Sequence, residues 1–265
     1  MLGRWPGTAE AVEVPTPYGA TRVNSCGPAG SPPVVLLPGG GATSTVWGAC
    51  AAAGLAGSRR VHAVDLMGDS GFSVPEPARP LRAVADLTSW VDAVLDGLGC
   101  GPVTLVGHSY GAWIAAHWAP ARAERLQRLV LLDPTRVFTG LRLPYVLRAL
   151  PVLVRPTPQR MRSFLTWENG GPVPDPLWLR LQEEGADFPA ARPVTGPRPD
   201  LAEPAELPHD RIDVLFAAHA RCHDATRAAR AARVALPGAR VDIIPGTHHA
   251  LPLTAAQEIA RRLTV

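Results

Sequence analysis

Apolar residues along this chain fall into two alternating patterns: short continuous runs, and longer stretches in which they recur every three or four residues. The short runs predict buried strands at 34–37, 61–65, 103–107, 129–132, 212–217 and 241–244. The longer stretches predict helices at 81–98, 110–119, 225–236 and 254–263. Strands that alternate with helices predict an α/β fold with a mostly parallel, doubly wound sheet covered by helices on both faces.

The N-terminal part has a different pattern. Residues 11–14 and 20–26 each read as a strand, and the link Thr16-Pro17-Tyr18-Gly19 between them contains the two strongest turn formers. Strands joined by so short a turn pair side by side in opposite directions. We therefore expect an antiparallel hairpin that leads into the sheet.

The segment 138–208 is a second departure, because the alternation stops there and proline becomes frequent. Short helical patterns remain at 145–150, 159–167 and 177–184, which favours a helical cap over disorder. The expected organisation is a core of 1–137 and 209–265 with the cap, 138–208, inserted into it. The cap aromatics Phe164, Trp167 and Trp178 could face a substrate, or they could pack the cap onto the core.

Composition limits the classes of protein that fit. At 265 residues with 46% hydrophobic content, the chain can bury one full core. The net charge of +3 is small and the arginines are scattered, which argues against a nucleic-acid partner. No stretch resembles a secretion signal or a membrane span, so we expect a soluble cytoplasmic protein with no membrane partner.

Two residue types exclude further chemistry. The chain contains no lysine, so a mechanism through a lysine Schiff base is impossible. Its four cysteines are widely spaced and form no C-x-x-C pair, which argues against a zinc knuckle or a disulfide scaffold. We expect no cofactor.

The pentapeptide Gly107-His108-Ser109-Tyr110-Gly111 stands where the predicted strand 103–107 meets the predicted helix 110–119. In a G-x-S-x-G turn the glycines let neighbouring backbone pass closely, so that the serine can hold strained dihedral angles with its hydroxyl exposed. Ser109 is therefore the candidate nucleophile. A glycine-rich strand-to-helix turn with an ordinary serine is the alternative.

A serine nucleophile needs a histidine base and a carboxylate that orients it. The loop Pro245-Gly246-Thr247-His248-His249 follows the last predicted strand and offers two histidines. His249 directly precedes the small-apolar-Pro run that opens the last helix, so we favour His249 as the base and keep His248 as the alternative.

These motifs, in this order and spacing, resemble the α/β-hydrolase fold superfamily over essentially the whole chain. The matching pieces are the loop Leu36 to Gly41, the loop Asp65 to Ser70, the G-H-S-Y-G turn, Leu132-Asp133-Pro134 and the His249 loop. The resemblance implies a serine hydrolase of the esterase type. It also implies that the N–H groups of Gly40 and Tyr110 form the oxyanion hole, although Pro38 replaces the histidine that commonly begins the first loop.

The resemblance does not settle which residue is the acid, that is, the carboxylate that orients the histidine. Most family members place it after the next-to-last strand, where this chain has Ala220. A second arrangement, as in haloalkane dehalogenases, places it after the strand that follows the nucleophile helix, and Asp133 stands there at the end of a buried strand. We choose Asp133. Asp224 is the alternative, although its place before a helical run makes it a natural N-cap.

The expected activity is cleavage of a carboxylic ester, lactone or thioester of a small, largely apolar molecule through an acyl-enzyme on Ser109. Residues expected to line the substrate pocket are Gly41, His108, Trp47, Phe164 and Trp167. Cleavage of a C–C bond, thioester release or cyclisation in a biosynthetic pathway, and non-catalytic ligand binding are the alternatives. A metal site at His219, Cys222, His223 and Asp224 is disfavoured, because that stretch reads as a loop. The oligomeric state stays open.

Overall fold

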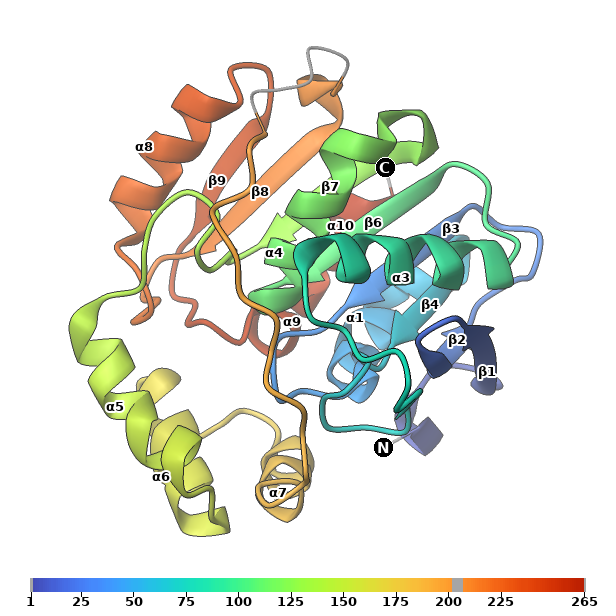
Figure 1. Ribbon diagram of the computed structural model, residues 1–265. Helices are drawn as coiled ribbons and strands as arrows, with labels where there is room; N and C mark the ends of the chain where they lie inside the picture. Colours follow the sequence, from blue (N-terminus) through green and yellow to red (C-terminus); the bar gives the residue numbers. More distant parts are fainter. Residues whose placement is uncertain (1, 202–206, 265) are drawn as a thin grey trace.

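The computed structural model of the chain describes residues 2–201 and 207–264, and a central sheet runs through them (Figure 1). Its strands are β1 (Glu10–Thr16), β2 (Gly19–Cys26), β3 (Pro33–Leu37), β4 (Arg60–Val64), β5 (Val74–Pro75), β6 (Val103–His108), β7 (Leu126–Leu132), β8 (Ile212–Ala217) and β9 (Arg240–Ile244). Several of them, including β6 and β8, are buried along their whole length, as expected for strands covered on both faces.

The strand order in the described part of the chain is β1-β2-β4-β3-β6-β7-β8-β9, with the short β5 paired to β2. The β1–β2 and β2–β4 pairs are antiparallel, and the pairs from β4 through β9 are parallel. The predicted N-terminal hairpin and the mostly parallel sheet are both confirmed. Because parallel strands share one carboxyl edge, the loops after β3, β6, β7, β8 and β9 meet there.

Helices cover both faces of the sheet (Figure 1). One face packs against α3 (Val84–Gly97), α4 (Tyr110–Trp118) and α8 (Ala225–Ala235). The other packs against α1 (Gly48–Cys50), α2 (Ala56–Ser58), α9 (Leu251–Thr254) and α10 (Ala256–Thr264). The predicted helices at 81–98, 110–119 and 225–236 correspond to α3, α4 and α8. The single helix predicted at 254–263 is instead two helices, α9 and α10, that meet at Ala255.

Between β7 and β8 the chain forms α5 (Leu143–Val154), α6 (Pro158–Glu168) and α7 (Pro176–Glu184), which lie below the sheet in Figure 1. All three were predicted, but α5 was predicted to end at residue 150 and continues through Pro151. We call residues 138–201 and 207–208 the inserted segment. Residues 202–206 of the predicted cap lie outside the described residues.

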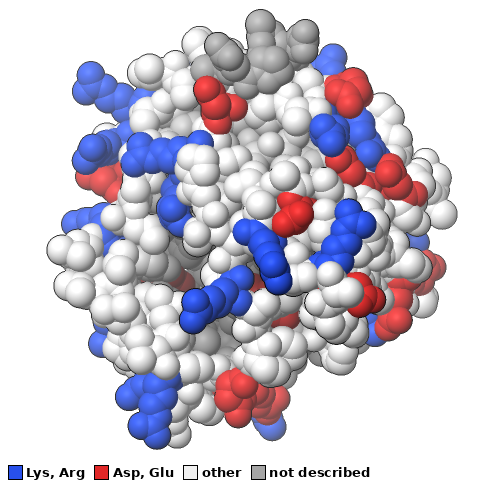
Figure 2. All heavy atoms as spheres, viewed as in Figure 1, with Lys and Arg blue, Asp and Glu red and all other residues white. Residues whose placement is uncertain are grey.

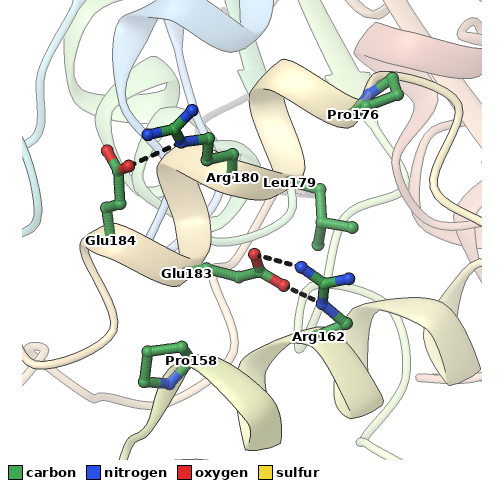
Figure 3. Close-up of a pocket in the computed structure, with 7 residues that line it drawn as sticks. All are labelled: Pro158, Arg162, Pro176, Leu179, Arg180, Glu183 and Glu184. Atoms are coloured by element: carbon green, nitrogen blue, oxygen red, sulfur yellow. Dashed lines mark hydrogen bonds and ion pairs between the residues drawn. The ribbon is translucent and has the colours of Figure 1, made fainter.

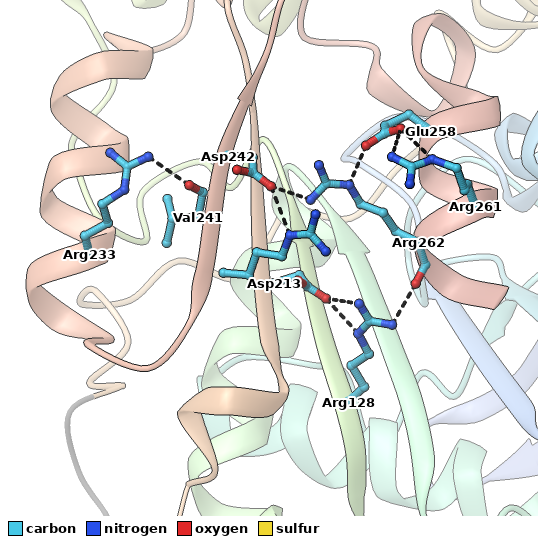
Figure 4. A network of polar contacts seen from close by, with 9 residues as sticks. Arg128, Asp213, Arg233, Val241, Asp242, Glu258, Arg261 and Arg262 are labelled. Atoms are coloured by element: carbon cyan, nitrogen blue, oxygen red, sulfur yellow. Dashed lines mark hydrogen bonds and ion pairs between the residues drawn. The ribbon is translucent and has the colours of Figure 1, made fainter. Parts of the chain in front are cut away.

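Ion pairs tie α10 to the amino ends of β7, β8 and β9 (Figure 4). Arg128 of β7 pairs with the buried Asp213 of β8, and its guanidinium also donates to the carbonyl of Arg262 in α10. Arg262 in turn contacts Asp242 of β9 and Glu258 of its own helix at 2.6 Å each. This network lies at the opposite end of the strands from the loops that follow Leu132, Ala217 and Ile244.

None of the helices in the described part of the chain combines enough residues with enough apolar character to cross a membrane.

Candidate active site

Ser109 stands between β6 and α4 in a strained backbone conformation, with φ of +52° and ψ of −110°. Glycine is needed on both sides. A Cβ on Gly107 would lie 2.3 Å from the carbonyl oxygen of Gly111, and one on Gly111 would lie 2.4 Å from that of Leu37. These close approaches explain the G-x-S-x-G pattern, because any side chain would force the turn apart. Positive φ at a residue other than glycine is costly, and it typically marks a functional position.

His249 reaches Ser109 from the loop between β9 and α9. Its Nε2 lies 2.9 Å from the Ser109 Oγ, within hydrogen-bond distance. The carbonyl of His249 accepts a hydrogen bond from the Nε2 of His108, at 2.8 Å, and the two rings lie with centroids 4.9 Å apart. His108 was expected to line the substrate pocket. It is instead buried and holds the backbone of the histidine that faces Ser109.

Asp133, at the end of β7, lies on the other side of the His249 ring. Its Oδ2 is 2.5 Å from the His249 Nδ1, so the ring donates Nδ1–H and leaves Nε2 free to accept the serine proton. Its Oδ1 accepts from the backbone N–H of Ala217 and from the Nε2 of His223, at 3.0 Å each. Three nitrogen atoms therefore hold this fully buried carboxylate in place: the Nδ1 of His249, the backbone N of Ala217 and the Nε2 of His223.

Asp133, His249 and His223 shift one another's pKa values, each favouring the charged form of its partner. Burial alone would raise the pKa of Asp133, but the hydrogen bonds from His223 and His249 lower it well below its usual value. Burial would lower the pKa of His249, but the Cys222 sulfur, the Glu168 carboxylate and the bond to Asp133 raise it well above the usual value. For His223, Asp133 likewise outweighs burial and raises the pKa to about 10. The site therefore holds an ionised carboxylate between two basic rings.

The loop after β3 runs alongside the serine. A Cβ placed on Gly39 would lie 3.3 Å from the Cβ of Ser109, and one on Gly40 would lie 3.8 Å from that of Tyr110. The structure thus brings together the two residues from which oxyanion donors were expected. Asp69 fixes the loop by accepting the N–H of Gly41 at 2.8 Å. Gly41 itself has φ of +75° and open space beside its Cα.

Two residues kept as alternatives from the sequence do not contact the candidate catalytic residues. The Asp224 side chain is exposed and caps α8, where it accepts the N–H of Arg227 at 2.9 Å. It is therefore an N-cap and not a partner of His249. The His248 ring faces the ring of His219, with centroids 5.4 Å apart, and not Ser109.

Trp47 corrects another expectation. Its side chain has no exposed surface, and it packs in the apolar cluster on the α10 face of the sheet. A residue without exposed surface offers a substrate nothing to contact. We therefore assign Trp47 to the core.

Tyr145 and Glu168 are residues of the inserted segment that sequence reasoning missed. The Tyr145 hydroxyl donates to the Glu168 Oε1 at 2.5 Å, and the Tyr145 ring packs with Phe164 and Trp167 at centroid distances of 5.6 and 6.0 Å. Burial together with the negative charges of Glu168 and Asp133 raises the pKa of Tyr145 well above its usual value. The charge of Asp133 thus acts on Tyr145, and that of Glu168 acts on His249. Phe164 and Trp167 lie beside Tyr145.

His223 was considered from the sequence only as a metal ligand, and its bond to Asp133 was missed. Cys222 lies beside it, with its sulfur 3.5 Å from the His249 Nδ1. Among the described residues, Asp133, Cys222 and His249 have donor atoms close enough for a metal ion. Those same atoms of Asp133 and His249 already bond to each other. His219 and Asp224 do not join this group.

A surface hollow between α6 and α7 is separate from these residues (Figure 3). Arg162 of α6 forms a two-point ion pair with Glu183 of α7 across it, and Arg180 pairs with Glu184 at 2.8 Å. The charged side chains that line the hollow are thus already paired with one another. The Arg162–Glu183 ion pair holds α6 against α7, and none of the predicted site residues lines the hollow.

Sequence comparison places the chain among known proteins. Residues 34–262 match the profile of a family described as the alpha/beta hydrolase family. Carboxylesterase YbfK of Bacillus subtilis (strain 168) is 28% identical over 269 residues, which cover 99% of this chain and 89% of the relative.

Solved structures have the same fold. The crystal structure of carboxylesterase CesB (YbfK) from Bacillus subtilis matches with a TM-score of 0.87 at 24% identity, over 99% of this chain and 92% of that one. Naproxen esterase (carboxylesterase NP) from Bacillus subtilis matches with a TM-score of 0.85 at 23% identity, over 100% of this chain and 94% of that one. Since the family profile spans most of the sequence and the fold agrees, the chain belongs to the alpha/beta hydrolase family.

Proposed function

We propose that this protein hydrolyses carboxylic esters of small, largely apolar molecules through an acyl-enzyme on Ser109. The observation that carries the proposal is the continuous chain of contacts from Ser109 Oγ to His249 Nε2, at 2.9 Å, and from His249 Nδ1 to Asp133 Oδ2, at 2.5 Å. The full-length similarity to a carboxylesterase supports an ester over other acyl substrates. Lactones and thioesters present the same reacting carbonyl.

In the first half-reaction the Ser109 Oγ forms a bond to the carbonyl carbon while the His249 Nε2 takes the serine proton. The carbonyl oxygen becomes an oxyanion, which the N–H groups of Gly40 and Tyr110 bind, each contributing about 3 kcal/mol in the transition state. The tetrahedral intermediate then breaks its bond to the alkoxy oxygen. His249 returns its proton to that oxygen, and an alcohol leaves.

In the second half-reaction water replaces the alcohol. His249 removes a proton from the water, the hydroxide oxygen bonds to the acyl carbon, and the same two N–H groups bind the oxyanion. The ester bond to Ser109 breaks, its oxygen regains the proton from His249, and a carboxylic acid leaves. Asp133 holds the His249 ring in one tautomer and stabilises the positive charge in both steps.

The inserted segment acts as a cap in this proposal. The rings of Tyr145, Phe164 and Trp167 pack on one another in this segment. We expect this apolar cluster to face the substrate, which favours apolar acyl or alcohol parts. A cap also limits the access of water to the site.

The test is a fluorophosphonate probe together with short p-nitrophenyl esters. We expect one covalent adduct, found at Ser109 by intact mass and peptide mapping, and hydrolysis of the acetate and butyrate esters. Absence of an adduct on the folded protein would contradict a serine hydrolase. An adduct together with cleavage of activated C–C substrates, and no ester hydrolysis, would favour the alternative activity.

Glu168→Gln should change the pH dependence of this activity. His249 must be neutral to act as a base, so kcat/KM rises with pH through the pKa of His249, which Glu168 helps to raise. Removing the negative charge lowers that pKa, and the rising limb of the kcat/KM profile should move to lower pH. Glutamine can still accept the Tyr145 hydroxyl.

The matched control is Glu184→Gln, which removes an exposed carboxylate of α7. Its pH profile should coincide with that of the unmodified protein. A limb that stays in place in Glu168→Gln, or that moves equally in both variants, would show that Glu168 does not act on His249.

A further inference from the structure

Helix α5 presents an exposed apolar stripe to the solvent. Leu143, Leu147, Leu150 and Val154 are exposed by 67%, 56%, 42% and 79%, respectively. They are spaced three or four residues apart, so they lie along one face of the helix. No residue of α5 is buried, which means that this face has no partner within the described chain.

Other apolar side chains of the inserted segment are exposed as well. They are Leu153 of α5 itself, and Leu141, Leu177 and Phe188 outside that helix. An apolar helix face of this kind is unusual on the surface of a protein that has no partner there.

The stretch of sequence that contains the stripe carries charges of one sign. Residues 134–167 contain six arginines and not one aspartate or glutamate. Arg142 and Arg155 directly flank α5, and Arg148 lies within it, all three exposed. At the lower left of Figure 2, where Figure 1 shows α5, uncharged surface is accompanied by arginine side chains.

An apolar stripe bordered by cationic side chains fits the boundary of a lipid layer with negatively charged headgroups. We propose that the outer face of α5 docks this protein on an anionic lipid surface. The helix lies in the plane of the surface, with its aliphatic side chains among the acyl chains and its arginines beside the phosphates. This attachment is peripheral and goes beyond the proposed function, on which it does not depend.

The charge also argues against a second copy of this chain as the occupant. Two copies that met through α5 would bring two arginine-rich segments together with no acidic residue between 134 and 167 to pair with them. An anionic surface instead gains favourable contacts from the exposed arginines in and beside α5, which are Arg142, Arg148 and Arg155.

The opposite face of the same helix carries Tyr145, which contacts Glu168 next to the candidate active site. Residue 145 is half a helical turn away from the stripe. In the docked protein, one face of α5 would therefore contact the lipid surface, and the opposite face would point toward the candidate active site.

Vesicle co-sedimentation at low salt tests the proposal, with the intact protein and either phosphatidylglycerol–phosphatidylcholine or pure phosphatidylcholine vesicles. We expect binding to the anionic vesicles that is at least tenfold tighter than to the zwitterionic ones and that weakens as salt is added. Leu147→Asp/Leu150→Asp should weaken it at least tenfold, and Arg142→Gln/Arg155→Gln should weaken it severalfold. Val234→Asp, which changes a 76% exposed aliphatic residue of α8, is the matched control and should bind like the unmodified protein.

Because all these side chains are exposed, the variants should keep the thermal midpoint and the near-UV circular dichroism of the unmodified protein. Hydrolysis of a water-soluble p-nitrophenyl ester should also be unchanged. If neither the unmodified protein nor any variant hydrolysed this ester, that result would contradict the proposed catalytic function and would leave the lipid-docking proposal unaffected. Equal sedimentation with both vesicle types, or none with either, would overturn the proposal. So would a dimer in analytical ultracentrifugation that Leu147→Asp/Leu150→Asp dissociates in the absence of vesicle binding.

Discussion

Ser109→Ala should lower kcat for p-nitrophenyl ester hydrolysis by about 10⁶-fold, because the alanine has no oxygen to form the acyl-enzyme. The residual rate comes from substrate binding and the oxyanion donors alone. The backbone at this position has φ of +52° with either residue, so the strain persists and the fold should not change. Steady-state kinetics and thermal unfolding measure the two effects separately.

Ser163→Ala is the matched control, since Ser163 is an exposed serine of α6 that contacts Arg148. It should keep its kcat within about twofold, as expected for a surface change away from the reacting groups. Fluorophosphonate should label this control and leave Ser109→Ala unlabelled. An alanine variant that retained a tenth of the activity would remove Ser109 from the mechanism.

Asp133→Asn should lower kcat by about 10⁴-fold with little change in KM. Asparagine keeps the shape of the side chain, and its carbonyl oxygen can still accept one of the N–H groups that now bind the carboxylate. It removes the negative charge, however, and its amide favours the wrong tautomer of His249. Since the hydrogen bond to Asp133 raises the pKa of His249, the pH profile of the remaining activity should also change.

The control is Asp224→Asn, which tests the acid rejected on structural grounds. Asparagine caps helices about as well as aspartate, so α8 should keep its stability and the enzyme its kcat. If Asp224→Asn were the slower variant, the assignment of Asp133 would be wrong. The pair thus separates an orienting carboxylate from a capping one, with the same chemical change at both positions.

Much of the fold was predictable because its signals are local. Apolar runs marked the strands, and the glycines around Ser109 marked the turn that they make possible. The length of helix α5 was underestimated because proline usually ends a helix. Pro151 instead lies inside this one, which continues to Val154. The helical residues 48–50 and 56–58 were not predicted at all, and they are too short to show a period.

Part of the candidate site could likewise be predicted from the sequence, and part could not. Ser109, Asp133 and His249 each follow a strand, so strand ends and family motifs together located them. Trp47 was wrongly predicted to line the pocket, because the sequence of a loop does not show whether an aromatic residue in it faces a pocket or the core. Tyr145, Glu168 and His223 could not be predicted as partners of the site, because only the packing of the inserted segment and of the loop after β8 brings them there.

The ion-pair network at the amino ends of β7, β8 and β9 matters for engineering. Arg128 lies in β7 and Asp133 directly follows the last residue of that strand, so about 16 Å of extended chain separates them. Changes at that distance, with no shared partners, usually add independently. Thermal tolerance could therefore be raised by redesigning the charges around Arg262 while selection for a new substrate proceeds at the other end of the sheet.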